Sequence, residues 1–264
     1  MALQILNPTA LGIGIAIALF VGILVCLALG RWLGRRIMAR HHVDALPSVG
    51  SLETAVFALL GLLIAFTFSG ALSRFDVRRA QVVDEANAIG TAWLRVDVLP
   101  ASAQPGLRDT MRDYVDARIA TYRKLPDIDA ARAELARSQQ LQGDIWRQAT
   151  AAVRLPDARP GLEVAVLPAF NAMFDITTVR IAATQMHPPT IIYAMLVGLA
   201  LASALLAGYQ AAGQASFDWV HGLAFAAVVA LTLYVVLDIE YPRLGFVRID
   251  AIDQLLVGVR AGMN

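Results

Sequence analysis

Four stretches of the chain are almost free of ionisable side chains, and charge-rich segments separate them. They comprise residues 9–30, 54–72, 190–209 and 219–237. Each is about 20 residues long, which is the length an α-helix needs to cross the hydrocarbon core of a bilayer. The pattern therefore predicts four transmembrane helices.

The second apolar stretch continues into a polar segment without any residue that would end a helix. No Pro and no turn cluster lies between Thr54 and Asp97. One helix is therefore expected to run from the membrane into water. That geometry suits an element that lines a pore or transmits a signal.

The middle third of the chain concentrates the charge. Residues 74–187 contain 15 of the 22 Lys and Arg residues and 14 of the 21 Asp and Glu residues. Turns that contain Pro divide this region into expected amphipathic helices over 107–125, 130–154 and 162–186. Such helices can pack as a bundle. We expect an all-α membrane protein with a first transmembrane pair (1–73), an inserted soluble helical domain (74–187), a second transmembrane pair (188–240) and a C-terminal tail (241–264).

Composition narrows the class of protein. With 58% hydrophobic residues, 16% charged residues and a mean hydropathy of +0.59, the chain is too apolar for an ordinary soluble domain. The single cysteine excludes an intramolecular disulfide and a cysteine-based metal cage. No catalytic or nucleotide-binding motif occurs, and no basic run suggests nucleic acid. We expect no enzyme activity, cofactor or metal.

The residues on either side of the first apolar stretch indicate whether it is a signal peptide or a membrane anchor. Residues 1–9 carry no Lys or Arg and no small-x-small cleavage site precedes Arg31, so an uncleaved anchor is favoured over a signal peptide.

The distribution of basic residues among the loops bears on orientation. The loop over 209–218 lacks Lys and Arg, which places it outside and the soluble domain in the cytoplasm. The four Arg residues of the first loop, 31–50, argue the other way. We favour the cytoplasmic placement, in a bacterial inner membrane.

Three motifs resemble a known group of membrane proteins. From Gly61 to Arg78, an apolar neck is followed by Phe66, the small polar Ser69 and the Arg74-Phe75 step, as in the second transmembrane helix of bacterial bestrophins. The continuation VVDEANAIGTAWLR over 82–95 and the tail LDIEYPRLGFVR over 237–248 are similar to motifs of bacterial bestrophin-like membrane proteins of unknown function.

The resemblance implies a homopentameric, largely helical ion channel whose second helix lines the axis. The implied partners are the bilayer, further copies of the chain and inorganic ions. True bestrophins have an additional aromatic residue after the Arg, where this chain has Phe75-Asp76. Asp250 and Asp253 are also too sparse to match the calcium clasp of animal bestrophins.

Four apolar residues are candidates for the pore lining. Phe57, Gly61, Ile64 and Phe68 recur at spacings of four, three and four, and therefore share one helix face. Around an axis, such a face would form a hydrophobic constriction that gates by dewetting. The alternative is ordinary helix packing or contact with lipid.

Charged residues flank this stretch. Glu53 begins the same face, and Arg74 and Arg78 follow it, with Arg79 next to them. At a pore mouth the Arg residues would raise the local anion concentration. They could equally anchor the helix at the interface, and Glu53 could cap the helix N-terminus.

A polar cluster follows, formed by Asp84, Glu85, Asn87, Thr91 and Arg95. Several of these residues are one helical turn apart and can cooperate on one face. A structural network that joins neighbouring helices is favoured over an ion site.

Two functions follow from these patterns. The first is an oligomeric, bestrophin-like ion channel, for anions rather than cations. The alternative is a non-conducting sensor or scaffold whose helical domain binds a partner. Trp146 and Tyr122 are candidates for an exposed apolar patch on such a domain.

Overall fold

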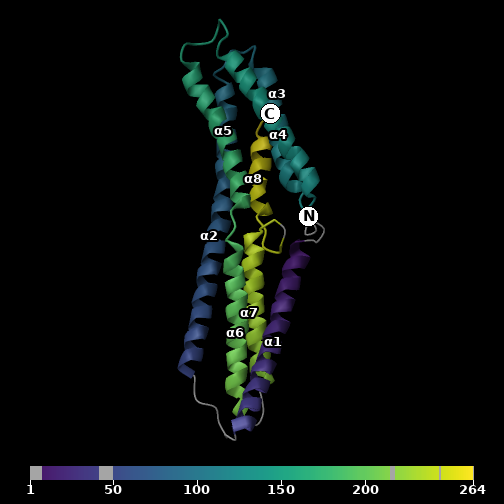
Figure 1. The fold of residues 1–264 in the computed structure, drawn as a ribbon. Helices are drawn as coiled ribbons and strands as arrows, with labels where there is room; N and C mark the ends of the chain where they lie inside the picture. Colours follow the sequence, from purple (N-terminus) through teal and green to yellow (C-terminus); the bar gives the residue numbers. More distant parts are fainter. Residues whose placement is uncertain (1–7, 42–49, 215–217, 244, 264) are drawn as a thin grey trace. The chain divides into compact units, whose positions relative to one another are not determined.

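The structure is a computed structural model that describes residues 8–41, 50–214, 218–243 and 245–263. Within these residues no strand occurs, and the helices, drawn in Figure 1, are α1 (Pro8–His41), α2 (Gly50–Val96), α3 (Gln104–Arg123), α4 (Ile128–Ala152), α5 (Leu162–Gln185), α6 (Thr190–Gln210), η2 (Ala211–Gly213), α7 (Trp219–Glu240) and α8 (Asp250–Ala261). Residues 42–49 and 215–217, which belong to the loops used in the topology argument, lie outside this description.

Four of the described helical segments are long and apolar enough to cross a membrane. They are the segments that contain α1, α2, α6 and α7. Together with the charged amphipathic helices α3 and α4 between them, they confirm the predicted all-α membrane fold.

The chain forms two compact units, which α2 links as one continuous helix of 47 residues. Unit 1 comprises the described residues as far as Arg74 together with His187–Phe246. Unit 2 comprises Phe75–Met186 and the described residues from Val247 onward. The segment expected as a C-terminal tail is thus divided, and its helix α8 belongs to unit 2.

Unit 1 is held together by close helix approach. Its helix α1 packs against both α6 and α7. A Cβ atom added at Gly30 would collide with the carbonyl oxygen of Leu205, and one at Gly208 would collide with the carbonyl oxygen of Leu27. Only glycine permits the backbones of α1 and α6 to come this near, as is common between membrane helices.

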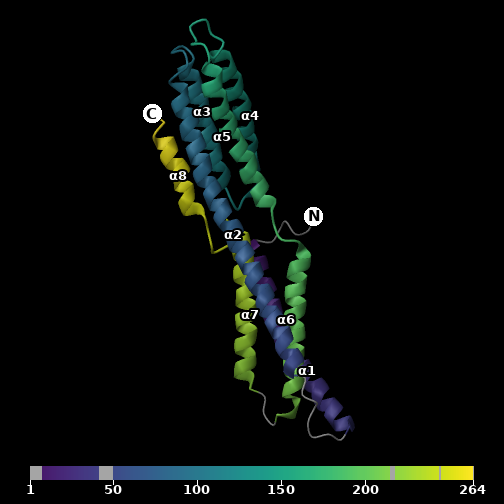
Figure 2. The same ribbon diagram turned by 90° about the vertical axis from the view of Figure 1, so that its left-hand side faces the viewer.

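Unit 2 is a bundle of α3, α4, α5 and α8 with the second half of α2 (Figures 1 and 2). Its core contains Ile89, Met111, Phe170 and Leu256, all fully buried. Asp127 caps the N-terminus of α4, since its side chain accepts a hydrogen bond from the backbone N–H of Ala130 at 3.0 Å. Close to the C-terminal end, Arg112 of α3 donates to the carbonyl oxygen of Met263 at 2.7 Å.

Candidate functional site on helix α2

Helix α2 keeps one face exposed along its whole length. In unit 1 the exposed positions recur every three to four residues and include Leu59, Leu62, Phe66 and Ser69. Phe66 is the most exposed of the large apolar residues on α2, at 67%. Because an α-helix turns about 100° per residue, these positions form one stripe. We call this stripe the open face of α2.

The four predicted pore residues do not share the open face. Phe57 is half-buried, and its ring lies edge-on to that of Phe225, with 5.4 Å between the centroids. Ile64 is also half-buried and packs against the core of unit 1. Gly61 and Phe68 are exposed. The expected face therefore divides between packing inside the chain and an exposed edge.

Arg74 lies beside the open face of α2, not on it, and binds a carboxylate of its own chain. Its Nε donates to both oxygens of Glu240 at 3.0 Å, and its Nη2 donates to Oε2 at 2.8 Å. The Glu240 side chain is fully buried and also lies 3.1 Å from Nδ1 of His187. That imidazole stacks on Tyr241 at 4.6 Å. Arg74 thus joins α2 to the end of α7 within unit 1.

Arg78 also binds acceptors of its own chain, and these lie in unit 2. Its guanidinium is buried and donates to the carbonyl oxygens of Ala183, at 3.2 Å, and Met186, at 3.1 Å. These carbonyls are at the end of α5, where the last turn of a helix leaves acceptors unsatisfied. Glu53, at the other end of α2, is half-buried.

The predicted polar cluster separates into two groups. Asp84, Asn87, Thr91 and Arg95 are exposed. Glu85 points the other way and is completely buried. Residues one turn apart share a side of α2, whereas adjacent residues such as Asp84 and Glu85 lie about 100° apart around the helix.

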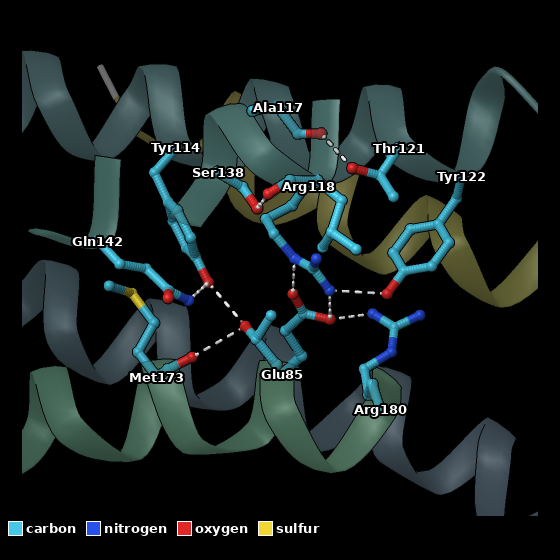
Figure 3. Close-up of polar contacts among 12 residues, drawn as sticks. Glu85, Tyr114, Ala117, Arg118, Thr121, Tyr122, Ser138, Gln142, Met173 and Arg180 are labelled. Carbon is cyan, nitrogen blue, oxygen red and sulfur yellow. Dashed lines mark hydrogen bonds and ion pairs between the residues drawn. The ribbon is translucent and has the colours of Figure 1, made fainter. Parts of the chain in front are cut away.

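Glu85 is the centre of a buried ionic triad in the core of unit 2 (Figure 3). Arg118 of α3 donates from Nε to its Oε1 at 2.6 Å, and Arg180 of α5 donates from Nη1 to its Oε2. Arg118 also donates to the hydroxyl of Tyr122 at 2.7 Å. Both guanidinium groups lie over the Tyr122 ring. The triad ties α2, α3 and α5 together.

The surroundings of the triad change the ionisation of its neighbours. Burial alone would lower the pKa of Arg118, but Tyr122 and Glu85 raise it above its ordinary value. Burial raises the pKa of the Tyr114 phenol, and Glu85 adds to that effect, while Arg118 opposes it. The Tyr114 hydroxyl lies 2.9 Å from that of Thr177. Arg118 therefore stays charged and Tyr114 stays neutral at ordinary pH.

Sequence analysis missed Arg118 and Arg180 as partners of Glu85. Arg118 follows Met111 and Val115 on the apolar stripe of α3, and Arg180 follows Met173 and Thr177 on that of α5. An Arg at a core position of an amphipathic helix needs a buried anion. Two such positions could have pointed to Glu85. Glu240 and His187 carried no comparable signal.

The chemistry of these sites is that of ionic cross-links and an exposed helix face. Among the described residues, no group of three or more His, Cys, Asp or Glu is placed to hold a metal ion.

The comparisons with known proteins agree with the fold. A family model described as the bestrophin-like domain matches residues 13–252. No curated protein and no solved structure matches the chain. The match covers α1 from residue 13 onward, all of α2 to α7 and the start of α8. The chain therefore belongs to the bestrophin-like family.

Proposed function

We propose that the protein is an oligomeric ion channel in which the open face of α2 lines the conduit. The observation that carries this proposal is the unpartnered stripe of Leu59, Leu62, Phe66 and Ser69 on the longest helix. Family membership supports it, since bestrophins are channels. By the same resemblance the oligomer is a pentamer.

In this proposal, Leu62 and Phe66 form the constriction. They are one turn apart on the open face, and both side chains are more than half exposed. A ring of such side chains repels water and can gate a pore by dewetting. Ser69 follows one turn after Phe66. Its side chain is small and polar, so the conduit is wider and hydrated at this position. Phe57 and Ile64, which pack inside their own chain, then support the helix from behind.

The preference for anions expected from the sequence depended on Arg residues at the pore mouth. Arg74 and Arg78 are bound to Glu240 and to backbone carbonyls respectively. We therefore propose that the protein conducts ions, and we do not propose a preference for anions.

We further propose that the protein lies in the inner membrane with unit 2 in the cytoplasm. The basic residues that follow the second span support this orientation. Arg31, one of the opposing residues in the first loop, donates to the carbonyl oxygen of Gln214 at 3.1 Å. That contact gives Arg31 a structural role that does not depend on the side of the membrane.

The scaffold alternative gains no specific support. Trp146 and Tyr122, the candidates for its apolar patch, are both half-buried. Tyr122 is occupied by the two Arg residues of the triad.

Ion flux into liposomes tests the proposal. Purified wild-type protein is compared with Phe66→Ala on the open face and with Ile64→Ala and Phe68→Ala away from its centre. We expect Phe66→Ala to raise the flux, because it removes the ring that excludes water, and Ile64→Ala to leave it near the wild-type rate. A rise confined to Ile64→Ala and Phe68→Ala would instead assign the lining to the face predicted from the sequence. Background flux from every inserted, oligomeric variant would contradict the channel.

A further inference from the structure

The last part of α1, residues 31–41, carries four Arg residues and no carboxylate. Two of these Arg residues bind the backbone of unit 1. Arg31 donates to the carbonyl oxygen of Gln214 at 3.1 Å, and Arg35 donates from Nε to that of Ala212 at 3.5 Å. Arg31 and Arg35 therefore join the end of α1 to the turn that follows α6.

Arg36 and Arg40 lie on another side of α1. They are one turn apart and exposed. At about 100° per residue, their side lies about 140° from that of Arg31 and Arg35. The Arg36 guanidinium lies 5.0 Å from the centroid of the Trp32 ring. Among the described residues, neither Arg36 nor Arg40 forms a side-chain hydrogen bond or an ion pair. Two guanidinium groups are thus available to an outside anion.

The same side of α1 is apolar further back along the helix. Val25, Leu29 and Trp32 are about half exposed. Together with Arg36 and Arg40 they form a stripe about 80° wide. This stripe is apolar along the predicted membrane span and cationic just beyond it, which is the pattern that a phospholipid presents in reverse sign.

The rise of α1 places both guanidinium groups near the headgroups of a bilayer. The uncharged stretch ends at Gly30. At about 1.5 Å per residue, the Cα atom of Arg36 lies about 9 Å further along the axis and that of Arg40 about 15 Å. Helical side chains lean toward the N-terminus, so both of these lean back toward the membrane. Their long stems bring the charges to the level of the lipid phosphates.

The charge at this end of unit 1 is also complementary to an anion. In its described part, the four Arg residues face two carboxylates, Glu53 and Asp218, which leaves two net positive charges with the His side chains neutral. Asp218 is used within the chain, since it accepts from the backbone N–H of Val220 at 3.0 Å and lies against His221. The excess positive charge attracts anions to this surface.

We propose that Arg36 and Arg40 bind the phosphate of an anionic phospholipid whose acyl chains lie on Val25, Leu29 and Trp32. Two guanidinium groups one turn apart can share a phosphate through charge-assisted hydrogen bonds. Stacking on Trp32 orients Arg36 and leaves the N–H donors at the edge of its plane available. The inference goes beyond the proposed function, because it requires unit 1 to lie in a membrane but does not require ion conduction. In the orientation proposed above, the lipid belongs to the outer leaflet.

The test is the thermal unfolding of the full-length protein in neutral detergent as phosphatidylglycerol is added, because a ligand of the folded state raises the midpoint. Phosphatidylcholine with the same acyl chains and inorganic phosphate are the comparison ligands. We expect phosphatidylglycerol to raise the midpoint more than either. In Arg36→Gln/Arg40→Gln its apparent Kd should rise by about 25-fold, since each basic residue near an anionic surface contributes about fivefold.

The matched control is Arg154→Gln/Arg159→Gln, which removes the same charge from exposed positions of unit 2. It should leave the Kd unchanged, and an equal weakening would reduce the effect to net charge and overturn the site. Equal stabilisation by phosphatidylcholine would assign the effect to acyl contacts alone. Equal stabilisation by inorganic phosphate would assign it to a free anion. Either result, or no stabilisation by phosphatidylglycerol, would overturn the lipid site. Conduction is measured separately by liposome flux, so the channel can stand or fall independently.

Discussion

Unit 1 and unit 2 are built from the same long helix, yet they are held together by different means. In unit 1, α1 and α6 approach so closely that Gly30 and Gly208 touch the backbone of the other helix. In unit 2, fully buried aliphatic and aromatic side chains surround an ionic triad of Glu85, Arg118 and Arg180.

If unit 1 lies in lipid and unit 2 in water, as proposed, the difference follows from the solvent. Lipid tails are as apolar as leucine, so membrane helices gain little from burying apolar side chains and rely on close packing. A bundle in water gains from every buried apolar side chain, and it can hold a buried ionic cluster that fixes how its helices align. One helix thus follows both rules: α2 contributes apolar contacts to unit 1 and the central carboxylate to unit 2.

The largest expected effect is the loss of the triad's carboxylate. Glu85→Ala leaves two buried guanidinium groups without their anion, which should destabilise unit 2 by about 3–5 kcal/mol. Hydrogen exchange of the amides in α3 and α5 measures this in detergent-solubilised protein. Asp84→Ala changes the adjacent, exposed carboxylate and should shift stability by less than about 0.5 kcal/mol. Equal effects of the two variants would show that the triad does not hold the bundle.

A smaller effect is expected for the glycine contact of unit 1. Gly208→Leu forces a side chain against the backbone of Leu27. The overpacking should cost about 1–3 kcal/mol and separate α1 from α6. Thermal unfolding in detergent measures the loss. Gly198→Leu is the control on the same helix, since a Cβ atom there meets nothing within 4 Å; if it were equally destabilising, close approach would not be the cause.

The smallest effect concerns Tyr114, beside the triad. Tyr114→Phe removes a buried hydroxyl and its hydrogen bond, at a loss of about 1 kcal/mol near neutral pH. Because the pKa of the folded phenol is raised above 10.0 by burial, the unfolded chain releases this proton first. The stability that Tyr114 contributes is therefore fully present below the pKa of the unfolded phenol. It is lost as the pH rises through the higher pKa of the folded phenol.

The free energy of unfolding, followed by circular dichroism between neutral and strongly alkaline pH, tests this sign. The wild type should lose stability more steeply above pH 10 than Tyr114→Phe. Parallel curves would mean that Tyr114 ionises as readily in the folded bundle as in the unfolded chain.

Much of the architecture could be predicted from local patterns. Uncharged stretches of about 20 residues predict membrane helices because the thickness of the bilayer sets their length. The continuous helix from Thr54 to Asp97 followed from the lack of any helix-breaking residue.

The candidate site was less accessible to this reasoning. Spacing places Phe57, Gly61, Ile64 and Phe68 on one face of α2, but spacing does not say which face another helix covers. Phe57 is covered because Phe225, 168 positions later, packs against it. The partners of Arg74 and Arg78 are likewise more than a hundred residues away.

The sequence by itself determined that this is a helical membrane protein with four apolar spans, an amphipathic insertion and one helix that continues from one into the other. These properties depend on hydropathy, periodicity and helix-breaking residues, all of which act within a few turns of the chain. Only the tertiary structure decided that Arg74 and Arg78 are turned inward, that Glu85 is buried between two Arg residues, and that Arg36 and Arg40 remain exposed on α1. Burial and pairing of charges depend on residues distant in the sequence, and only folding brings those residues together.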